Sequence, residues 1–300
     1  MNIKDIVKSQ ALRHTILRSL SWLPDTVMLP LQYYLILHRR LNMKNPVRFT
    51  EKIQCYKAFY RNPEMLKCTD KYLVRDYVAQ KLGNEKYLNT LYQVCDRAED
   101  IDFESLPEKF VIKTTDGGSG DNVFICRDKS KIDLHEVRAR VDSWRDKKYY
   151  KVSREWAYRG ARKSRIIVER YLSQENSDEL LDYKFFCFNG KVEFFKVDFD
   201  RQIDHKANYY NVDMVQLPFG ECECPPDPSR SFSKPENFQT MVELAEKLSE
   251  PFPFVRVDFY NINGVIYFGE LTFYPGSGYT RFLPDSADFE WGKLFTYTFK

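Results

Sequence analysis

The sequence predicts an α+β protein in which two sheet-bearing lobes follow a helical N-terminal arm. Two β-hairpins are the clearest evidence, because residues 182–200 turn at Asn189-Gly190 and residues 254–278 turn at Asn263-Gly264. Residues 1–60 contain no alternation of strands and helices and predict no Rossmann unit. The chain has 300 residues, of which 43% are hydrophobic, and this is ample for a buried core.

The elements follow in order along the chain. Residues 1–60 have helical spacing of apolar residues, with breaks expected at Pro24, Pro30 and Pro46. Residues 70–83 predict a helix that ends at Gly83, a natural C-cap. The other expected elements are strands at residues 88–94, 109–114, 122–126 and 165–172, and helices at residues 133–146 and 236–249.

Positive charge gathers in two blocks although the net charge is only +3. Residues 1–60 carry ten Lys/Arg against three acidic residues, and residues 138–170 carry twelve against four. These blocks suit an anionic polymer, a nucleotide or an acidic membrane surface. Solvated helix faces explain either block equally well. Aromatic residues interleave with the second block, but no nucleic-acid-binding module accompanies them, so we expect no nucleic acid partner.

Seven scattered cysteines and the absence of a signal-peptide pattern favour a reducing, cytoplasmic location. A peripheral contact of the basic arm with the inner face of the membrane is a second expectation. Cys222 and Cys224 form a C-x-C pair without a second pair at zinc-finger spacing, so a metal there is disfavoured. The role of His205 stays open between a surface histidine and an acceptor-site residue.

Paired carboxylates are expected on the last hairpin. Strand alternation places Arg256 and Asp258 on one face, and on the return strand it places Phe268, Glu270 and Thr272 on one face. Counted from the turn, Asp258 comes near Glu270. Two carboxylates on one sheet face need a cation, and Mg²⁺ prefers such oxygen ligands. The alternative is a solvent-facing sheet with its charges outside.

A glycine-rich loop joins two apolar runs at residues 114–122, with Lys113 at its entrance. Glycine lets backbone N–H groups approach phosphates closely, and lysine adds a point charge. The loop is not a Walker A motif, because no G-K-[ST] follows and no helix begins there. Taken by itself it is equally an ordinary surface turn.

In this order the motifs resemble those of the ATP-grasp superfamily, as in D-alanine–D-alanine ligase, and within it the TupA-like group of teichuronopeptide and capsular polysaccharide synthesis. The resemblance covers nearly the whole chain. It rests on the strings LNMKNPVRFTEKIQ, TDKYLVRDYV, FVIKTTDGGSGDNV, DYKFFCFNGK and FPFVRVDFYNINGVIYFGELTFYPGSG.

The resemblance implies an ATP-grasp fold whose two lobes clamp ATP. It implies an arm at residues 1–66, a small lobe at residues 67–168 and a large lobe at residues 169–300. The residues implied to bind ATP are Lys71 and Lys113 at the α- and β-phosphates, the flap of Gly117, Gly118, Ser119 and Gly120, the hinge acid Glu169 with Arg170, Tyr171 and Leu172 around the purine, Asp182 at the ribose, and Lys184 at the triphosphate.

The resemblance further implies Mg²⁺ on Asp258 and Glu270, and Arg256 as the group that stabilises the transferring phosphoryl group. Lys113 and Lys184 complete the catalytic set. Two departures stand out. The usual Glu-x-Asn is here Glu270-x-Thr272, so that Thr272 is the third metal candidate, with a water between its hydroxyl and the ion. A basic helical arm also replaces the usual α/β pre-domain that helps to bind the acceptor.

The function implied is ATP-dependent carboxylate–amine ligation through an acyl phosphate. The acceptor would be a uronic acid of a sugar nucleotide, a lipid-linked glycan or a polysaccharide, and the donor an amino acid or small amine. Two alternatives stay open: a phosphotransferase that phosphorylates a sugar on the same scaffold, and a non-catalytic nucleotide- or glycan-binding protein. A ligase needs both carboxylate and amine to release ADP, whereas a kinase leaves a phosphorylated sugar.

Overall fold

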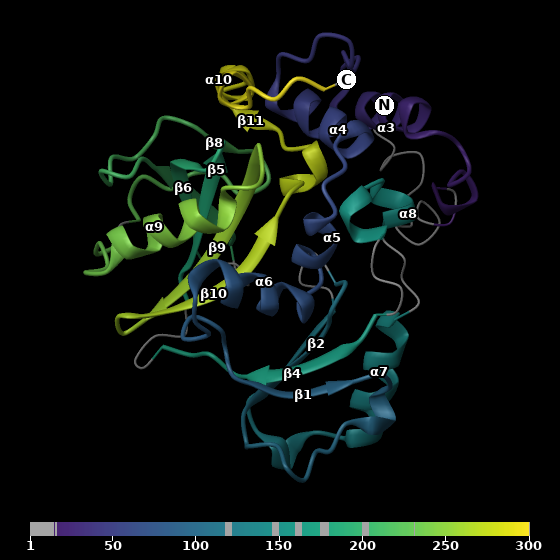
Figure 1. The fold of residues 1–300 in the computed structure, drawn as a ribbon, viewed down its shortest axis with the longest axis vertical. Coiled ribbons are helices and arrows are strands. Elements are labelled where there is room, and N and C mark those ends of the chain that lie inside the picture. The colour runs from purple at the N-terminus through teal and green to yellow at the C-terminus, as the bar shows by residue number, and fades with distance from the viewer. Residues whose placement is uncertain are drawn as a thin grey trace.

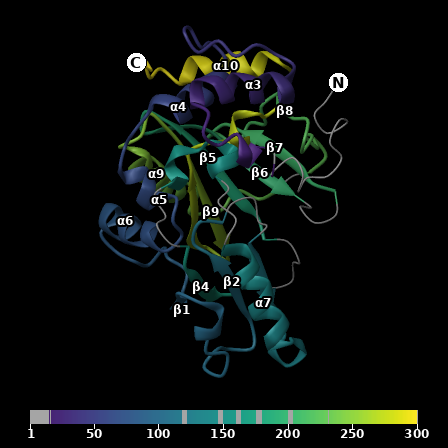
Figure 2. The same ribbon diagram turned by 90° about the vertical axis from the view of Figure 1, so that its right-hand side faces the viewer.

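Two antiparallel sheets form the two lobes of the protein, with helices packed around them (Figure 1). The computed structural model describes residues 15, 17–117, 122–145, 150–159, 164–174, 180–199, 204–230 and 232–299. Figure 2 shows that the smaller sheet and the helices α3, α4 and α10 lie at opposite ends of the molecule. The α+β class is therefore confirmed.

The smaller sheet has four strands in the order β1–β4–β2–β3. Its strands are β1 (Leu91–Cys95), β2 (Phe110–Thr114), β3 (Val123–Cys126) and β4 (Ile166–Arg170). Helix α7 (Leu134–Arg145) covers one face, where Val137 and Val141 join Phe110 and Ile112 in a buried core. Val111 of β2 and Ile167 of β4 point to the other face of this sheet and are buried as well.

The larger sheet has five strands in the order β10–β9–β5–β6–β7. Its strands are β5 (Asp182–Phe188), β6 (Lys191–Phe199), β7 (Lys206–Tyr210), β9 (Phe254–Ile262) and β10 (Val265–Thr272). Helix α9 (Phe238–Ser249) packs on one face, against buried residues such as Phe185 and Phe195. A two-stranded sheet of β8 (Gly220–Glu221) and β11 (Phe282–Leu283) lies beside β7.

Both predicted hairpins are confirmed. Asn189-Gly190 and Asn263-Gly264 turn with positive φ at both residues, as a two-residue turn requires. Each hairpin also contains one β-bulge that was not predicted. One lies between Phe186 and Cys187, where β5 pairs with β6, and the other lies between Phe268 and Glu270, where β10 pairs with β9. The second bulge corrects an expectation, because it reverses the alternation and places Phe268 opposite buried Phe259, on the face away from Glu270.

The arm forms helices α3 (Asp25–Leu37) and α4 (Phe49–Phe59), followed by α5 (Glu64–Cys68) and α6 (Leu73–Leu82). The break expected at Pro30 is wrong, since α3 runs through it. Burial of Leu29 just before Pro30 and of Tyr33 in the turn after it offsets the backbone hydrogen bond that proline cannot make. Gly83 caps α6 in the left-handed region, as expected.

The lobes are closely joined to the arm. Phe49 of α4 packs edge-on against Phe254 of β9 and Trp291 of α10 (Ser286–Leu294), so α4 shares the core of the large lobe. Strand β4 crosses residues 168 and 169, where the sequence placed a boundary between lobes.

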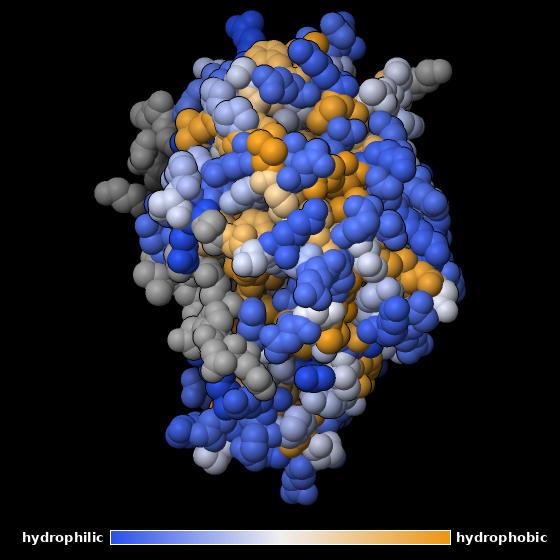
Figure 3. Space-filling model, turned by 90° about the vertical axis from the view of Figure 1, so that its left-hand side faces the viewer, coloured by the Kyte–Doolittle hydropathy of each residue, from blue (hydrophilic) through white to orange (hydrophobic). Residues whose placement is uncertain are grey.

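On the face viewed in Figure 3, hydrophilic side chains surround and separate the apolar ones. Within the described part of the chain, no helix combines the length and apolarity needed to cross a bilayer.

Candidate active site

Four side chains of the last hairpin meet on one face of the large sheet. Glu270 pairs directly with Asp258, and Thr272 pairs with Arg256. Arg256 donates from Nε and Nη2 to the two oxygens of Asp258, at 2.7 and 2.6 Å. Its Nη2 also donates to Glu270 Oε1 at 2.8 Å and to Thr272 Oγ1 at 3.0 Å. The hairpin therefore gathers two carboxylates, one guanidinium and one hydroxyl at one point.

Burial governs the ionisation of this group. Asp258 is 3% exposed, and burial raises its pKa to about 6 although Arg256 and Lys184 act to lower it. Burial would by itself lower the pKa of Arg256, but Asp258 and then Glu270 outweigh it and raise the pKa. Burial also acts to raise the pKa of Glu270, yet Arg256 and Lys71 hold this pKa below its usual value. Half of the Glu270 side chain reaches solvent, which screens this last effect.

Lys184 links the hairpin to the two neighbouring strands. Its buried ammonium forms ion pairs with Asp182, with Asp198 at 3.1 Å and with Asp258 at 3.5 Å. Burial would lower the pKa of Lys184, but Asp182 and Asp258 outweigh burial and raise it. Lys184 is therefore a permanent cation beside the carboxylates. Asp198 is a partner that sequence reasoning missed.

The small lobe contributes two lysines and one acid. Lys113 Nζ lies 2.9 Å from Glu169 Oε2, and Arg75 lies 3.5 Å from the same carboxylate. The backbone N–H of Lys71 donates to Thr115, and its ammonium donates to the carbonyl of Gly117. Burial lowers the pKa of Lys71, and the negative charge of Glu270 acts to raise it. Lys71 of the small lobe therefore interacts electrostatically with Glu270 of the large lobe.

The predicted purine-binding segment begins in the last two residues of β4 and continues beyond it. The backbone N–H of Arg170 donates to the carbonyl of Thr90 at 2.9 Å, and its carbonyl accepts from Asn89 Nδ2 at 2.9 Å. Tyr171 and Leu172 are half-buried beyond the strand end. Asn89 Oδ1 is buried and has no hydrogen-bond partner among the described residues. Asn89 Oδ1 therefore offers a hydrogen-bond acceptor beside this segment, and no sequence motif pointed to it.

The glycine-rich loop is described only at its two ends. Gly117 lies where a Cβ atom would come within 2.9 Å of both Asn122 and Thr114, so its backbone packs closely against the other end of the loop. The other flap residues, Gly118, Ser119 and Gly120, lie outside the described residues.

A loop after β10 adds a second group that sequence reasoning missed. Gly276, Ser277 and Gly278 all have positive φ. Lys57 of α4 is fully buried and donates to the carbonyl and hydroxyl of Ser277, at 2.6 and 2.9 Å. Gln54 of the same helix donates to the carbonyl of Gly278 at 2.8 Å. Helix α4 therefore fixes the loop that follows Thr272. The only sequence signal was the helical spacing of Gln54 and Lys57.

His205 and Cys224 meet at the far side of the polar face. The ligand atoms of Asp198, His205 and Cys224 lie within 4.8 Å of one another. The ammonium of Lys196 lies 3.4 Å from Asp198 Oδ1 and 3.9 Å from Cys224 Sγ. Because this cation already neutralises the group, we assign no metal to it.

Comparison with known protein families identifies the family to which this chain belongs. The family model described as TupA-like ATPgrasp matches residues 51–296. The chain belongs to the TupA-like ATP-grasp family. This confirms the predicted family and fold, and ATP-dependent ligation is the class of chemistry of ATP-grasp enzymes. No curated protein matches the chain.

Solved structures of other ATP-grasp proteins are similar to this one at low identity. A D-alanine–D-alanine ligase from Bacillus anthracis has a TM-score of 0.47 and 19% identity, over 76% of this chain and 65% of that one. The enzyme of the same name from Helicobacter pylori has a TM-score of 0.42 and 17% identity, over 76% and 60%. A D-cycloserine synthetase has a TM-score of 0.42 and 15% identity, over 77% and 71%. The chain spans less than two thirds of the length of both D-alanine–D-alanine ligases.

The residues present fit a divalent cation at this ATP-grasp site. Along the polar face of the large sheet, the described residues include five carboxylates and three cations: Asp182, Asp198, Glu221, Asp258 and Glu270 against Lys184, Lys196 and Arg256. Asp258 and Glu270, which face each other across two strands, offer the carboxylate oxygens that Mg²⁺ prefers.

Proposed function

We propose that the chain is an ATP-dependent carboxylate–amine ligase that requires Mg²⁺ and forms an amide through an acyl phosphate. One observation carries this proposal: the carboxylates of Asp258 and Glu270 lie opposite each other, joined by Arg256 and beside the buried ammonium of Lys184. Such a group is suited to bind a metal–triphosphate and to neutralise the charge of a phosphoryl group in transfer.

Each residue of the site has a role in this proposal. Asp258 and Glu270 hold Mg²⁺, with Thr272 acting through a water, and the ion neutralises phosphate charge when it is bound. Lys71, Lys113 and the flap bind the phosphates of the substrate ATP. The remaining nucleotide contacts come from the adenine hinge and the ribose acid, namely Glu169, Arg170, Tyr171, Leu172 and Asp182.

The chemical steps need positioning more than acid–base catalysis. The acceptor carboxylate attacks the γ-phosphate, the bond to the β-phosphate oxygen breaks, and ADP leaves. The amine then attacks the acyl carbon and inorganic phosphate leaves. Arg256 and Lys184 stabilise the charge on the phosphoryl group in the first step and on the tetrahedral intermediate in the second.

The acceptor in this proposal is a uronic acid of a surface polysaccharide or of its precursor, and the donor is an amino acid or small amine. The TupA-like family and the basic arm support this substrate class. The reaction would then take place in the cytoplasm, with the arm at the inner face of the membrane.

A substrate panel tests the proposal. The chain is incubated with ATP, Mg²⁺, UDP-uronates and amines, and products are identified by mass spectrometry. The proposal predicts ADP release only when both carboxylate and amine are present, together with a product of the summed mass less water. A stable phosphorylated sugar without amine would instead indicate a phosphotransferase. ATP binding without any turnover would indicate a non-catalytic protein.

A further inference from the structure

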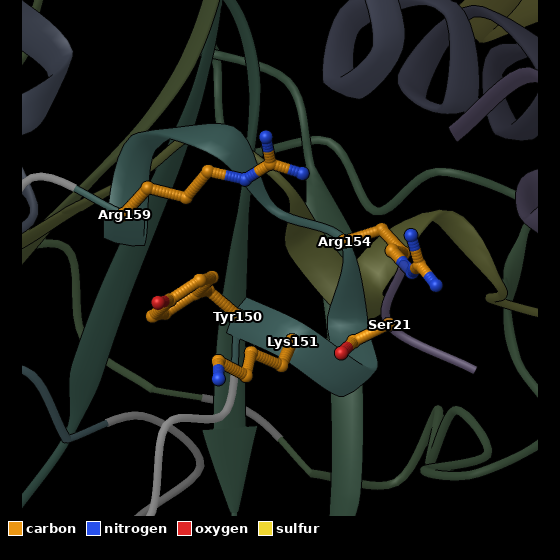
Figure 4. Close-up of a pocket in the computed structure, with 5 residues that line it drawn as sticks. All are labelled: Ser21, Tyr150, Lys151, Arg154 and Arg159. Atoms are coloured by element: carbon orange, nitrogen blue, oxygen red, sulfur yellow. The ribbon is translucent and has the colours of Figure 1, made fainter. Parts of the chain in front are cut away.

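A basic pocket lies where the two positively charged blocks of the sequence meet. It has a volume of about 210 Å³ and is lined by Ser21 of the arm and by Tyr150, Lys151, Arg154 and Arg159 (Figure 4). Figure 4 shows that four of these residues come from the short segment of residues 150–159. The residues of the proposed ATP site do not line it.

The charge of the pocket is unbalanced. Lys151, Arg154 and Arg159 bring three positive charges, and Asp25 is the carboxylate that pairs with both arginines, at 3.3 and 3.2 Å. Burying cations without an equal number of carboxylates costs free energy, and a bound anion removes this cost. The five lining residues carry a charge of +3, and Asp25 reduces this to +2.

Arg154 is built into the wall of the pocket. Its side chain is 3% exposed and its φ is +61°, in the left-handed region. Its two terminal nitrogens donate to the carbonyls of Leu23 and Leu20, both at 2.7 Å. Its Nε is buried and has no hydrogen-bond partner among the described residues. A donor of this kind, held in place and unsatisfied, indicates a missing acceptor.

The segment that carries the pocket also reaches the ATP site. Gln32 of α3 donates to the carbonyl of Val152 at 2.9 Å, and Lys57 of α4 donates to the carbonyl of Ser153 at 3.0 Å. Tyr158, next to Arg159, is half-buried, and desolvation followed by the charges of Glu155 and Glu270 raises its pKa. A ligand in the pocket is therefore joined to the metal-binding hairpin by a short, firmly held stretch of chain.

We propose that this pocket binds the diphosphate group of the acceptor substrate, while the acceptor carboxylate lies at Arg256. This inference rests on the proposed function. A diphosphate diester carries two negative charges and matches the pocket, whereas a uronate carboxylate carries one. The volume of about 210 Å³ lies below the roughly 300–1,000 Å³ of pockets that hold whole drug-sized ligands, which suits a diphosphate group and is too small for a whole nucleotide sugar.

Anion binding to the full chain tests this proposal directly. The protein is first saturated with Mg²⁺ and the non-hydrolysable analogue AMP-PNP to occupy the ATP site. Inorganic pyrophosphate is then titrated by calorimetry into wild type, Lys151→Gln, Arg159→Gln and the control Arg97→Gln. Arg97 is an exposed arginine of the small lobe, ion-paired with Asp100. Arg154 is left unchanged, because it also holds the arm.

The pocket predicts one additional pyrophosphate per chain. Each pocket variant should raise the Kd by about tenfold, because a charge-assisted hydrogen bond is lost, and Arg97→Gln should leave it unchanged. Absence of binding, or equal affinity in all four proteins, would overturn the proposal.

Two competitors then identify the source of the diphosphate. UDP-glucuronate represents a soluble sugar nucleotide, and phosphatidylcholine vesicles carrying a polyprenyl diphosphate represent a lipid-linked precursor. Displacement of pyrophosphate by either one supports the acceptor assignment and names the source, whereas displacement by neither overturns it. Because this readout is binding without turnover, its failure is distinct from failure of the ligase proposal.

Discussion

Glu270 lies directly opposite Asp258 across β9 and β10, and Arg256 joins their carboxylates. This pairing depends on the bulge between Phe268 and Glu270, without which Glu270 would be displaced by one residue and face the other side of the sheet. The bulge thereby places both carboxylates beside Lys184 and within the electrostatic reach of Lys71 from the small lobe.

Substitution of either carboxylate should abolish turnover. Asp258→Asn and Glu270→Gln keep the side-chain shape but remove a negative ligand, so Mg²⁺-dependent ADP release should fall by at least about a hundredfold. Circular dichroism should show an intact fold. Wild-type turnover in either variant would disprove the metal assignment.

The stability of the metal-free chain should fall as pH rises through the titration of Asp258. Burial raises the pKa of Asp258 to about 6 in the folded chain, above the unfolded value of roughly 3.9. The stabilisation by its protonated form is complete below about pH 4 and is lost by pH 6, which amounts to about 3 kcal/mol at most.

Chemical denaturation between pH 4 and pH 7 checks this expectation. The free energy of unfolding of wild type should decrease relative to that of Asp258→Asn over this range. Saturating Mg²⁺ should reduce the decrease, because the ion binds the ionised carboxylate. A difference between the two proteins that stays constant with pH in the absence of Mg²⁺ would contradict it.

Gly269 should be required at the bulge. A Cβ atom there would lie 3.0 Å from the carbonyl oxygen of Asp258, so Gly269→Ala must shift that backbone by a few tenths of an ångström. We expect turnover to fall by about threefold to tenfold, because small displacements of a reacting geometry are costly. Val265→Ala, an exposed position in the same strand, is the control. Steady-state kinetics that are equal for both variants would refute the role of the bulge.

Loss of Lys184 should destabilise the large lobe. Lys184→Met leaves Asp182, Asp198 and Asp258 without their shared cation, at a cost of about 3–5 kcal/mol. The exposed Lys247→Met should change the free energy of unfolding by less than about 0.5 kcal/mol. Denaturant titrations of both proteins measure the effect. Equal stability would show that Lys184 does not neutralise these carboxylates.

Thr272→Asn tests the departure from the usual metal ligands. The Thr272 hydroxyl donates to Glu270 Oε1 at 2.9 Å and accepts from Arg256. A carboxamide at this position can still accept from Arg256 and reaches further toward a metal. Turnover should therefore be retained or increased at limiting Mg²⁺. A variant that fails to fold would instead make Thr272 a structural residue.

The elements of the fold that could be predicted are those specified locally. Asn-Gly turns fixed both hairpins, and Gly83 fixed the end of α6. The bulges could not be predicted, because they depend on packing between strands. Strand β7 and helix α10 were not expected either. The break predicted at Pro30 is wrong because burial of the helix outweighs the tendency of proline to interrupt it.

The residues of the candidate site also differ in whether they could be predicted from the sequence. Asp258, Glu270 and Arg256 were accessible from strand alternation and a recognised motif, and the structure brings them together. Lys57 and Asp198 were not, because their roles arise from contacts between segments distant in sequence. The contact of Glu169 with Lys113 likewise arises from the pairing of β4 with β2, and its contact with Arg75 from the approach of α6. The assigned roles of Lys71, Glu169 and Asp182 toward ATP stay predictions.

An isotope label in the acceptor carboxylate tests whether ligation passes through an acyl phosphate. A uronate acceptor identified by the substrate panel is prepared with ¹⁸O in its carboxylate and incubated with ATP, Mg²⁺ and the amine, and the released phosphate is analysed by mass spectrometry. Ligation through an acyl phosphate predicts one ¹⁸O atom in each inorganic phosphate. Phosphate without ¹⁸O, alongside ADP formation, would contradict it.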